Sequence, residues 1–160
     1  MQISFTEEEQ MIQETAKQFA DTELKPNTKK VEEPEGRALF LENIAKLGEL
    51  GFMGINIKES YGGIEAGSAA FSMAITELAR GCASTAVTTS VTNMVAEVIQ
   101  AVGNDKQKQS YLPRICAGEF LAAGFCLTES TAGSDPSAMK TTAVRDGDNY
   151  ILTGNKLYIT

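Results

Sequence analysis

The feature that most constrains the fold is a change of hydrophobic period just after Glu119. Before this point, apolar residues recur every three or four positions, which is the pattern of a helix with one buried face. After it, short apolar or alternating runs are separated by turn residues, which is typical of strands. Helices first and antiparallel strands after predict an α+β chain. We expect an up-down helical domain at residues 1–120 and the first strands of a truncated antiparallel β domain at 121–160.

Five helices are predicted in the first domain. Thr6 and Glu9 form a capping box that starts the first helix at Glu7, and Pro26 closes this stretch. The face that this helix buries is predicted to carry Met11, Ile12, Thr15, Ala16 and Phe19. A polar connection follows, and the further helices are expected at residues 37–50, 68–79, 84–102 and 106–117. Pro113 should kink or shorten the last of them.

The extended part is expected to contain four strands, at residues 120–127, 141–145, 150–153 and 156–159. The first is an apolar run that is typical of a buried strand. Asp146-Gly147-Asp148-Asn149 is expected to join the second and third strands as a hairpin, and Gly154-Asn155 to turn the chain before the fourth. A small sheet with an unpaired edge invites self-pairing, so we expect a homo-oligomer.

Composition excludes several classes of protein. The net charge is −7 and the basic residues form no long block, so no nucleic-acid partner is expected. Histidine is absent and the three cysteines, Cys82, Cys116 and Cys126, are far apart, which disfavours a disulfide framework and a zinc site. A reducing, cytoplasmic setting fits best. No signal peptide and no membrane insertion are expected, because no apolar run approaches membrane-spanning length.

The stretch Phe125 to Asp135, FCLTESTAGSD, carries the main candidate functional residues. An apolar run stops there at a loop of hydroxyl groups, glycine and free backbone N–H groups, which suits the polar edge of an oxygen-rich ligand. The same residues are also the usual residues of turns, so an ordinary turn is the alternative. Asp135 is interpreted as a structural turn cap.

The loop and shorter motifs along nearly the whole chain resemble the acyl-CoA dehydrogenase family. The shared motifs are Thr6-Glu7-Glu8-Glu9, Tyr61-Gly62-Gly63, Glu77-Leu78-Ala79-Arg80, Gly103 to Lys108, Tyr111-Leu112-Pro113, Leu127-Thr128-Glu129, Gly133-Ser134-Asp135 and Gly154 to Thr160. The chain departs from the pattern at Lys58, where relatives commonly carry proline, and at Tyr158, where many carry tryptophan. The resemblance implies an α domain, a middle β domain and a C-terminal helical bundle that bind FAD and acyl-CoA between them.

The resemblance assigns Phe125, Leu127 and Thr128 to the flavin ring. Thr128 would offer its hydroxyl and its backbone N–H to the polar edge of the ring, where negative charge grows on reduction. The simpler structural explanations are that Phe125 and Leu127 belong to the core and that Thr128 is a strand residue. The resemblance also implies that Glu129 orders or caps the loop rather than acting as the catalytic base.

Further cofactor and substrate contacts are implied for residues on either side. Gly133 and Ser134 would approach the FAD pyrophosphate and the CoA side of the substrate, because glycine permits close backbone approach. Tyr158 would pack against the flavin ring, and Thr160 would form a hydrogen bond near its N5 atom. The alternatives are a turn cap for Ser134, a cross-strand aromatic for Tyr158 and a strand residue for Thr160.

The helix expected at 84–102 is implied to line the acyl pocket. Val87, Ser90, Val91 and Met94 recur on one face of it at helical spacing, so the resemblance makes them substrate-binding residues. The simpler explanation is a stripe of helix core.

The activity implied by the resemblance is α,β-desaturation of an acyl-CoA thioester in fatty acid metabolism, with an electron-transfer flavoprotein or similar acceptor as partner. Relatives take the catalytic base from a glutamate in the C-terminal helical domain, which has no counterpart up to Thr160. No catalytic residue is therefore assigned, and the chain is expected to be inactive alone. A flavin oxidase or monooxygenase on the same scaffold, and a non-catalytic helical interaction module, stay open as alternatives.

Overall fold

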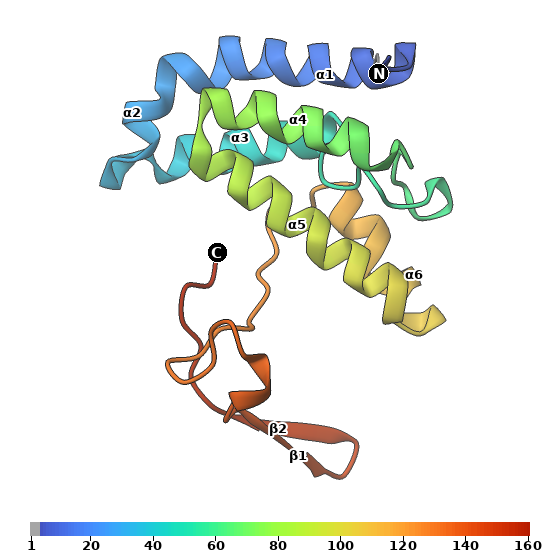
Figure 1. The fold of residues 1–160 in the computed structure, drawn as a ribbon, viewed down its shortest axis with the longest axis vertical. Helices are drawn as coiled ribbons and strands as arrows, with labels where there is room; N and C mark the ends of the chain where they lie inside the picture. The colour runs from blue at the N-terminus through green and yellow to red at the C-terminus, as the bar shows by residue number, and fades with distance from the viewer. Residues whose placement is uncertain (1–3) are drawn as a thin grey trace. The chain divides into compact units, whose positions relative to one another are not determined.

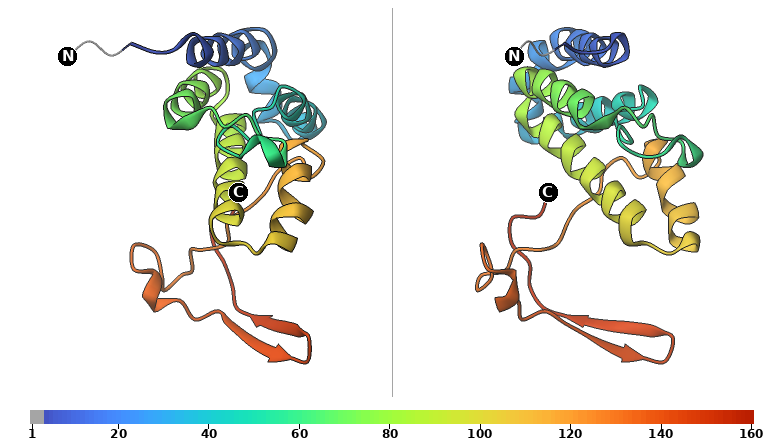
Figure 2. Two further views of the ribbon diagram at one scale, coloured as in Figure 1. Left: turned by 90° about the vertical axis from the view of Figure 1, so that its right-hand side faces the viewer. Right: turned by 45° about the vertical axis from the view of Figure 1, so that its right-hand side comes forward.

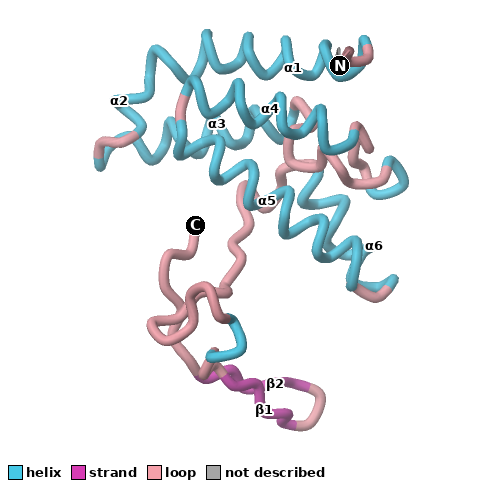
Figure 3. The backbone as a smooth tube through the Cα atoms, viewed as in Figure 1, coloured by secondary structure: helices cyan, strands magenta, loops and turns pink. Residues whose placement is uncertain are grey.

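The computed structural model describes residues 4–160, which pack as two units, one reaching to Ala123 and one spanning Gly124–Thr160 (Figure 1). Within the described residues, the α-helices lie in the first unit and the paired strands in the second (Figure 3). The predicted α+β class, with helices before antiparallel strands, is therefore confirmed. Among residues 4–160, no helix has the length and apolar character needed to cross a membrane.

The predicted helix boundaries agree closely with the structure. The α-helices are α1 (Glu7–Phe19), α2 (Thr28–Val31), α3 (Arg37–Glu49), α4 (Gly67–Gly81), α5 (Ala83–Val102) and α6 (Asp105–Cys116). Hydrogen-bonded N-terminal caps explain where α1 and α6 begin. Thr6 Oγ1 accepts the Glu9 N–H at 3.2 Å and the Glu9 carboxylate accepts the Thr6 N–H at 2.8 Å, while Asn104 and Gln107 exchange the same two bonds ahead of α6.

Two expectations about this unit, on the connection and on Met11, were wrong in detail, and the expected effect of Pro113 is decided only for the shortening. The expected connection at 27–36 contains the one-turn helix α2 and a 3-10 turn, because the chain stays helical through a π-helical turn and a 3-10 turn that includes Pro26. Pro113 does not end α6, which continues to Cys116. Met11 is 65% exposed although it was placed on the buried face, whereas Thr15 is half-buried, since only one side of α1 meets α4.

The core of the helical unit lies between α1, α3, α4 and the first half of α5. Its buried side chains include Ile12, Ala16 and Phe19 of α1, Ile44 and Leu47 of α3, and Ala70, Ala74 and Leu78 of α4. In the left-hand view of Figure 2, α1, α3 and α4 are seen nearly end-on, whereas α5 runs from top to bottom in the plane of the picture. Helix α5 therefore crosses the other three, and a second buried cluster forms where it meets α6.

Helix α5 buries polar rather than apolar side chains on much of its inner face. Asn93 is fully buried and makes three hydrogen bonds: its Nδ2 donates to Phe52 O at 2.8 Å and Thr89 O at 2.9 Å, and its Oδ1 accepts the Ile55 N–H at 2.9 Å. The segment around Phe52–Ile55 has no regular secondary structure of its own. Asn93 therefore supplies the partners that this buried backbone requires.

The second unit contains the predicted hairpin. Strands β1 (Thr142–Asp146) and β2 (Asn149–Thr153) pair antiparallel, with Asp146 opposite Asn149 on either side of the two-residue Gly147-Asp148 turn. Gly147 has φ +59°, as the tight turn requires. Every residue of both strands is exposed, and apolar side chains such as Val144 and Leu152 lie on opposite faces of the hairpin.

The first and fourth predicted strands are not strands. Residues 120–127 and 156–159 are extended or irregular, because the ladder of backbone bonds that defines a sheet is missing between them. The predicted buried strand is also exposed: Phe120 is 38% exposed and Phe125 40%. Gly154 does not turn a hairpin; it is required because a Cβ there would collide with the side chain of Thr141.

Candidate functional site

Two segments that were assigned to the flavin lie side by side in the second unit. We call residues 125–135 the signature loop and residues 157–160 the closing segment. The Leu157 N–H donates to Thr128 O at 2.9 Å, and a Cβ at Gly124 would lie 3.1 Å from Thr160 O. The two segments therefore run antiparallel in close contact. The structure brings Phe125, Leu127 and Thr128 together with Tyr158 and Thr160.

The carboxylate of Glu129 holds the base of the signature loop. Its Oε2 accepts the Lys140 N–H at 2.7 Å, and its Oε1 accepts the Thr141 N–H at 3.1 Å and the Lys156 ammonium at 2.8 Å. The Glu129 side chain is only 5% exposed. The Lys156 ammonium and these backbone N–H groups lower the pKa of Glu129 to about 2. The interpretation of Glu129 as a loop-ordering group is confirmed.

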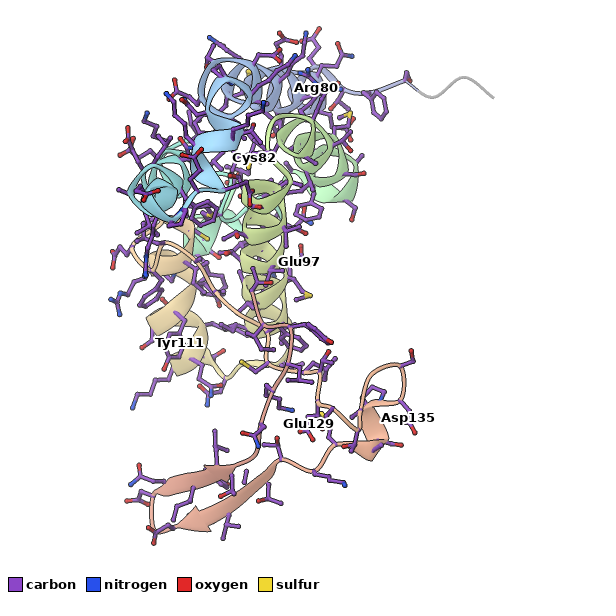
Figure 4. All side chains as sticks on the ribbon, turned by 90° about the vertical axis from the view of Figure 1, so that its left-hand side faces the viewer. Arg80, Cys82, Glu97, Tyr111, Glu129 and Asp135 are labelled. Atoms are coloured by element: carbon purple, nitrogen blue, oxygen red, sulfur yellow. The ribbon has the colours of Figure 1, made fainter. Side chains whose placement is uncertain are left out.

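Asp135 caps the short 3-10 turn Pro136–Ala138 at the far end of the loop (Figure 4). Its Oδ1 accepts the Ser137 N–H at 3.0 Å and the Ser137 hydroxyl at 2.6 Å, and these bonds lower the pKa of Asp135. Asp135 is a structural turn cap, as predicted.

On either side of Glu129 the signature loop leaves backbone donors without partners. Among residues 4–160, no atom accepts the N–H of Thr128, Gly133 or Ser134. Thr128 is half-buried, and Gly133 and Ser134 are exposed. A Cβ at Gly133 would meet nothing within 4 Å. A loop with these donors, clear of its own side chains, fits the oxygen-rich edge of a flavin and its pyrophosphate.

The apolar residues among the predicted flavin-binding residues are not core residues of either unit. Phe125 is 40% exposed and Leu127 36%, so the core explanation for them is wrong. Tyr158 is 92% exposed and has φ +57°, which excludes a cross-strand aromatic in a regular sheet. A bulky residue in the left-handed region is an outlier that is most common at functional positions. Thr160 is exposed as well.

The predicted substrate-binding residues lie on the outer side of α5, in the helical unit. Val87, Ser90 and Val91 line an apolar groove of about 220 Å³ whose other walls are Ile75, Ala79, Ala83 and Ala86. Met94 is one turn further along and does not line this groove. Val87 is 51% exposed and Met94 40%, so the helix-core explanation is wrong for both.

Sequence reasoning missed Lys156 as part of the site. Lys156 stands 27 positions from Glu129, and although it lies in the shared motif Gly154 to Thr160, nothing in that motif identifies Glu129 as its partner. Asn93 was missed for the same reason, because an isolated asparagine in a helical pattern gives no sign of its partners.

Comparison with known proteins gives the family. Residues 6–119 match the family model for the acyl-CoA dehydrogenase N-terminal domain. The chain is 35% identical to the short-chain specific acyl-CoA dehydrogenase of Clostridium acetobutylicum, over all of this chain and 42% of that protein.

Two solved structures have the same fold. One, from work on the electron transferring flavoprotein of Acidaminococcus fermentans, has a TM-score of 0.87 and 38% identity over 99% of this chain and 41% of that one. The other, an acyl-CoA dehydrogenase with FAD from Bacillus anthracis, has a TM-score of 0.87 and 30% identity over 98% of this chain and 27% of that one. The chain spans about two fifths of the length of the first of these relatives. It belongs to the acyl-CoA dehydrogenase family.

Proposed function

We propose that this chain is the N-terminal portion of an FAD-dependent acyl-CoA dehydrogenase, which removes hydrogen from the α and β carbons of an acyl-CoA thioester. The observation that carries the proposal is the set of unpartnered N–H groups at Thr128, Gly133 and Ser134 in the signature loop, with Thr128 bonded to the closing segment. FAD, when bound, supplies the hydride acceptor that this reaction needs. The acyl-CoA dehydrogenases to which the chain is similar, one of them with a structure solved in complex with FAD, support the same assignment.

Each cofactor-binding residue has a distinct task in this proposal. Thr128 donates its N–H to the polar edge of the flavin, while Phe125 and Leu127 cover the ring with apolar surface. Gly133 and Ser134 bring backbone donors to the pyrophosphate, and the absence of a Cβ at Gly133 leaves room for that approach. Tyr158 packs against the ring from the closing segment, and Thr160 forms its hydrogen bond near the ring nitrogen.

The acyl chain is assigned to the outer groove on α5. Val87, Ser90 and Val91 line it, and Met94 extends the same face of the helix. The small side chains of Ala79, Ala83 and Ala86 leave the groove open, which suits an apolar chain of moderate size. Ser134 serves the CoA side of the same substrate.

Proton abstraction next to the thioester carbonyl needs a carboxylate with a raised pKa. Glu129 does not meet this requirement, because its carboxylate is occupied by Lys156 and two backbone N–H groups and its pKa is lowered to about 2. We therefore propose that no residue of this chain is the base, and that the chain alone does not turn over acyl-CoA. Robust turnover by the chain, measured with a panel of acyl-CoAs, would refute this.

An electron acceptor, an oligomeric state and a cellular compartment are proposed as well. An electron-transferring flavoprotein is the proposed acceptor, supported by the source of one similar structure. The exposed apolar side chains on both faces of the β1–β2 hairpin support a homo-oligomer. A cytoplasmic setting is supported by the three free cysteines.

FAD titration tests the cofactor proposal directly. Flavin fluorescence should be quenched as the chain is added, and Gly133→Ala should weaken binding without lowering the thermal midpoint, because the added Cβ meets no protein atom within 4 Å. Ser137→Ala, in the neighbouring 3-10 turn, is the control for general disturbance of the loop. A wild-type chain that quenches no flavin fluorescence would leave the helical interaction module as the better reading.

A further inference from the structure

The ion pair between Glu129 and Lys156 connects the two flavin-facing segments at three consecutive residues. The Lys156 ammonium donates to Leu127 O at 2.9 Å and to Glu129 Oε1 at 2.8 Å, and the next residue, Leu157, donates its N–H to Thr128 O at 2.9 Å. Residues 127, 128 and 129 are therefore each bonded to residue 156 or 157. Among the described residues, no regular sheet ladder supports this junction.

The environment of the pair argues for a role in positioning. The Glu129 side chain is 5% exposed and that of Lys156 20%, so both ions have lost much of their hydration. Ion pairs of this kind often contribute little net stability, because the desolvation cost offsets the attraction. The structure therefore retains an ion pair whose attraction is offset by desolvation, at the point where Thr128 on one side and Tyr158 on the other are held in register.

The backbone of the closing segment is consistent with such a constraint. Tyr158 has φ +57°, a conformation that is unfavourable for a non-glycine residue and persists only where the surrounding structure imposes it. The bonds of Lys156 and Leu157 fix the chain immediately before Tyr158. They thereby set the direction in which Tyr158 and Thr160 continue.

We infer that Glu129 and Lys156 are positioning residues: their ion pair clamps the closing segment to the signature loop, so that Thr128 and Tyr158 meet the same flavin ring. This inference rests on the proposed function, because it assumes that the ligand is FAD. It assigns no chemical step to either residue.

Replacement of the lysine tests the clamp. Lys156→Met removes the ammonium but keeps the length of the side chain, and Glu129 keeps its two backbone donors. The affinity for FAD, measured by quenching of flavin fluorescence, should fall about tenfold or more, because the ammonium's hydrogen bonds to Leu127 O and Glu129 Oε1 are both lost. Amide exchange at Leu157 should become faster in the absence of FAD. Lys156→Arg, which keeps the charge and the donors, should restore most of the affinity.

A matched control separates the clamp from the general loss of a positive charge. Lys140 is close in sequence to the same loop, and its ammonium has no partner among residues 4–160. Lys140→Met makes the same change of charge and should leave both FAD affinity and exchange at Leu157 unchanged. An equal loss of affinity in both variants would overturn the inference, because the effect would then be long-range attraction of the FAD phosphates.

The results also distinguish this inference from the proposed function. If the wild-type chain binds FAD and Lys156→Met binds it equally well, the clamp is refuted and the proposed function stands. If the wild-type chain shows slow exchange at Leu157 but binds no FAD, the proposed function is refuted, and so is the role of the ion pair in positioning the cofactor-binding residues. A loss of affinity in Lys156→Met together with faster exchange at Leu157 supports positioning, whereas a loss of affinity with exchange at Leu157 unchanged refutes the clamp.

Discussion

Replacing Asn93 with leucine should destabilise the helical unit strongly. The substitution keeps the branched shape of the side chain and its number of heavy atoms but removes the acceptor of the Ile55 N–H and the donor to Phe52 O, both at 2.8–2.9 Å. Each buried backbone group left without a partner costs about 1–3 kcal/mol, so the two together predict a loss of about 2–6 kcal/mol. Thr89 O adds nothing to this sum, because it also accepts the regular helical bond. We expect a fall in the thermal midpoint of about 10 °C.

Asn43 provides a matched control in the same unit. It is also fully buried, but among the described residues neither its Nδ2 nor its Oδ1 has a hydrogen-bond partner. Asn43→Leu should therefore leave the free energy of unfolding unchanged or raise it, since it removes an unsatisfied polar group. Urea denaturation, followed by the helix signal in circular dichroism at about 222 nm, measures the free energy of unfolding of both variants. Equal losses of stability in the two variants would refute the reasoning, because burial alone would then explain them.

Three further predictions concern other parts of the chain. The pKa of Glu129 is lowered from an ordinary value of 4.5 to about 2, so the contribution of Glu129 to stability should be complete above pH 4.5 and disappear as the pH falls towards 2. Glu129→Gln should abolish this pH dependence in an acid titration followed by amide exchange at Thr141, and an unaltered acid profile would contradict the prediction. Leu152, which is 73% exposed, should support self-association, so Leu152→Lys should lower the sedimentation coefficient; a wild-type chain that sediments as a monomer would disprove this. Gly63→Ala should destabilise the chain by about 1–3 kcal/mol, because the added Cβ would collide with Ile57 O. If the chain tolerates Gly63→Ala as readily as Gly133→Ala, the backbone around Gly63 can relax and the prediction is wrong.

Local sequence signals determined most of the helical unit. The Thr6 and Asn104 caps and the recurring apolar residues each act within one or two turns of a helix, so their effect can be read from neighbouring residues. The Gly147-Asp148 turn is local in the same sense, and it was predicted correctly. The candidate flavin residues were likewise found from a contiguous motif, and their roles stay predictions.

The tertiary structure decided what depends on distant partners. Whether residues 120–127 form a strand depends on a backbone ladder with another segment, and an apolar run carries no record of its partner. Which side of α1 is buried depends on where α4 lies, so Met11 was misplaced. Lys156 joins Glu129 across 27 residues, and no local pattern announces such a pair. The sequence alone thus determined the helices and the signature loop, whereas the junction of the loop with the closing segment required the fold, because charges and amides far apart in the chain meet only there.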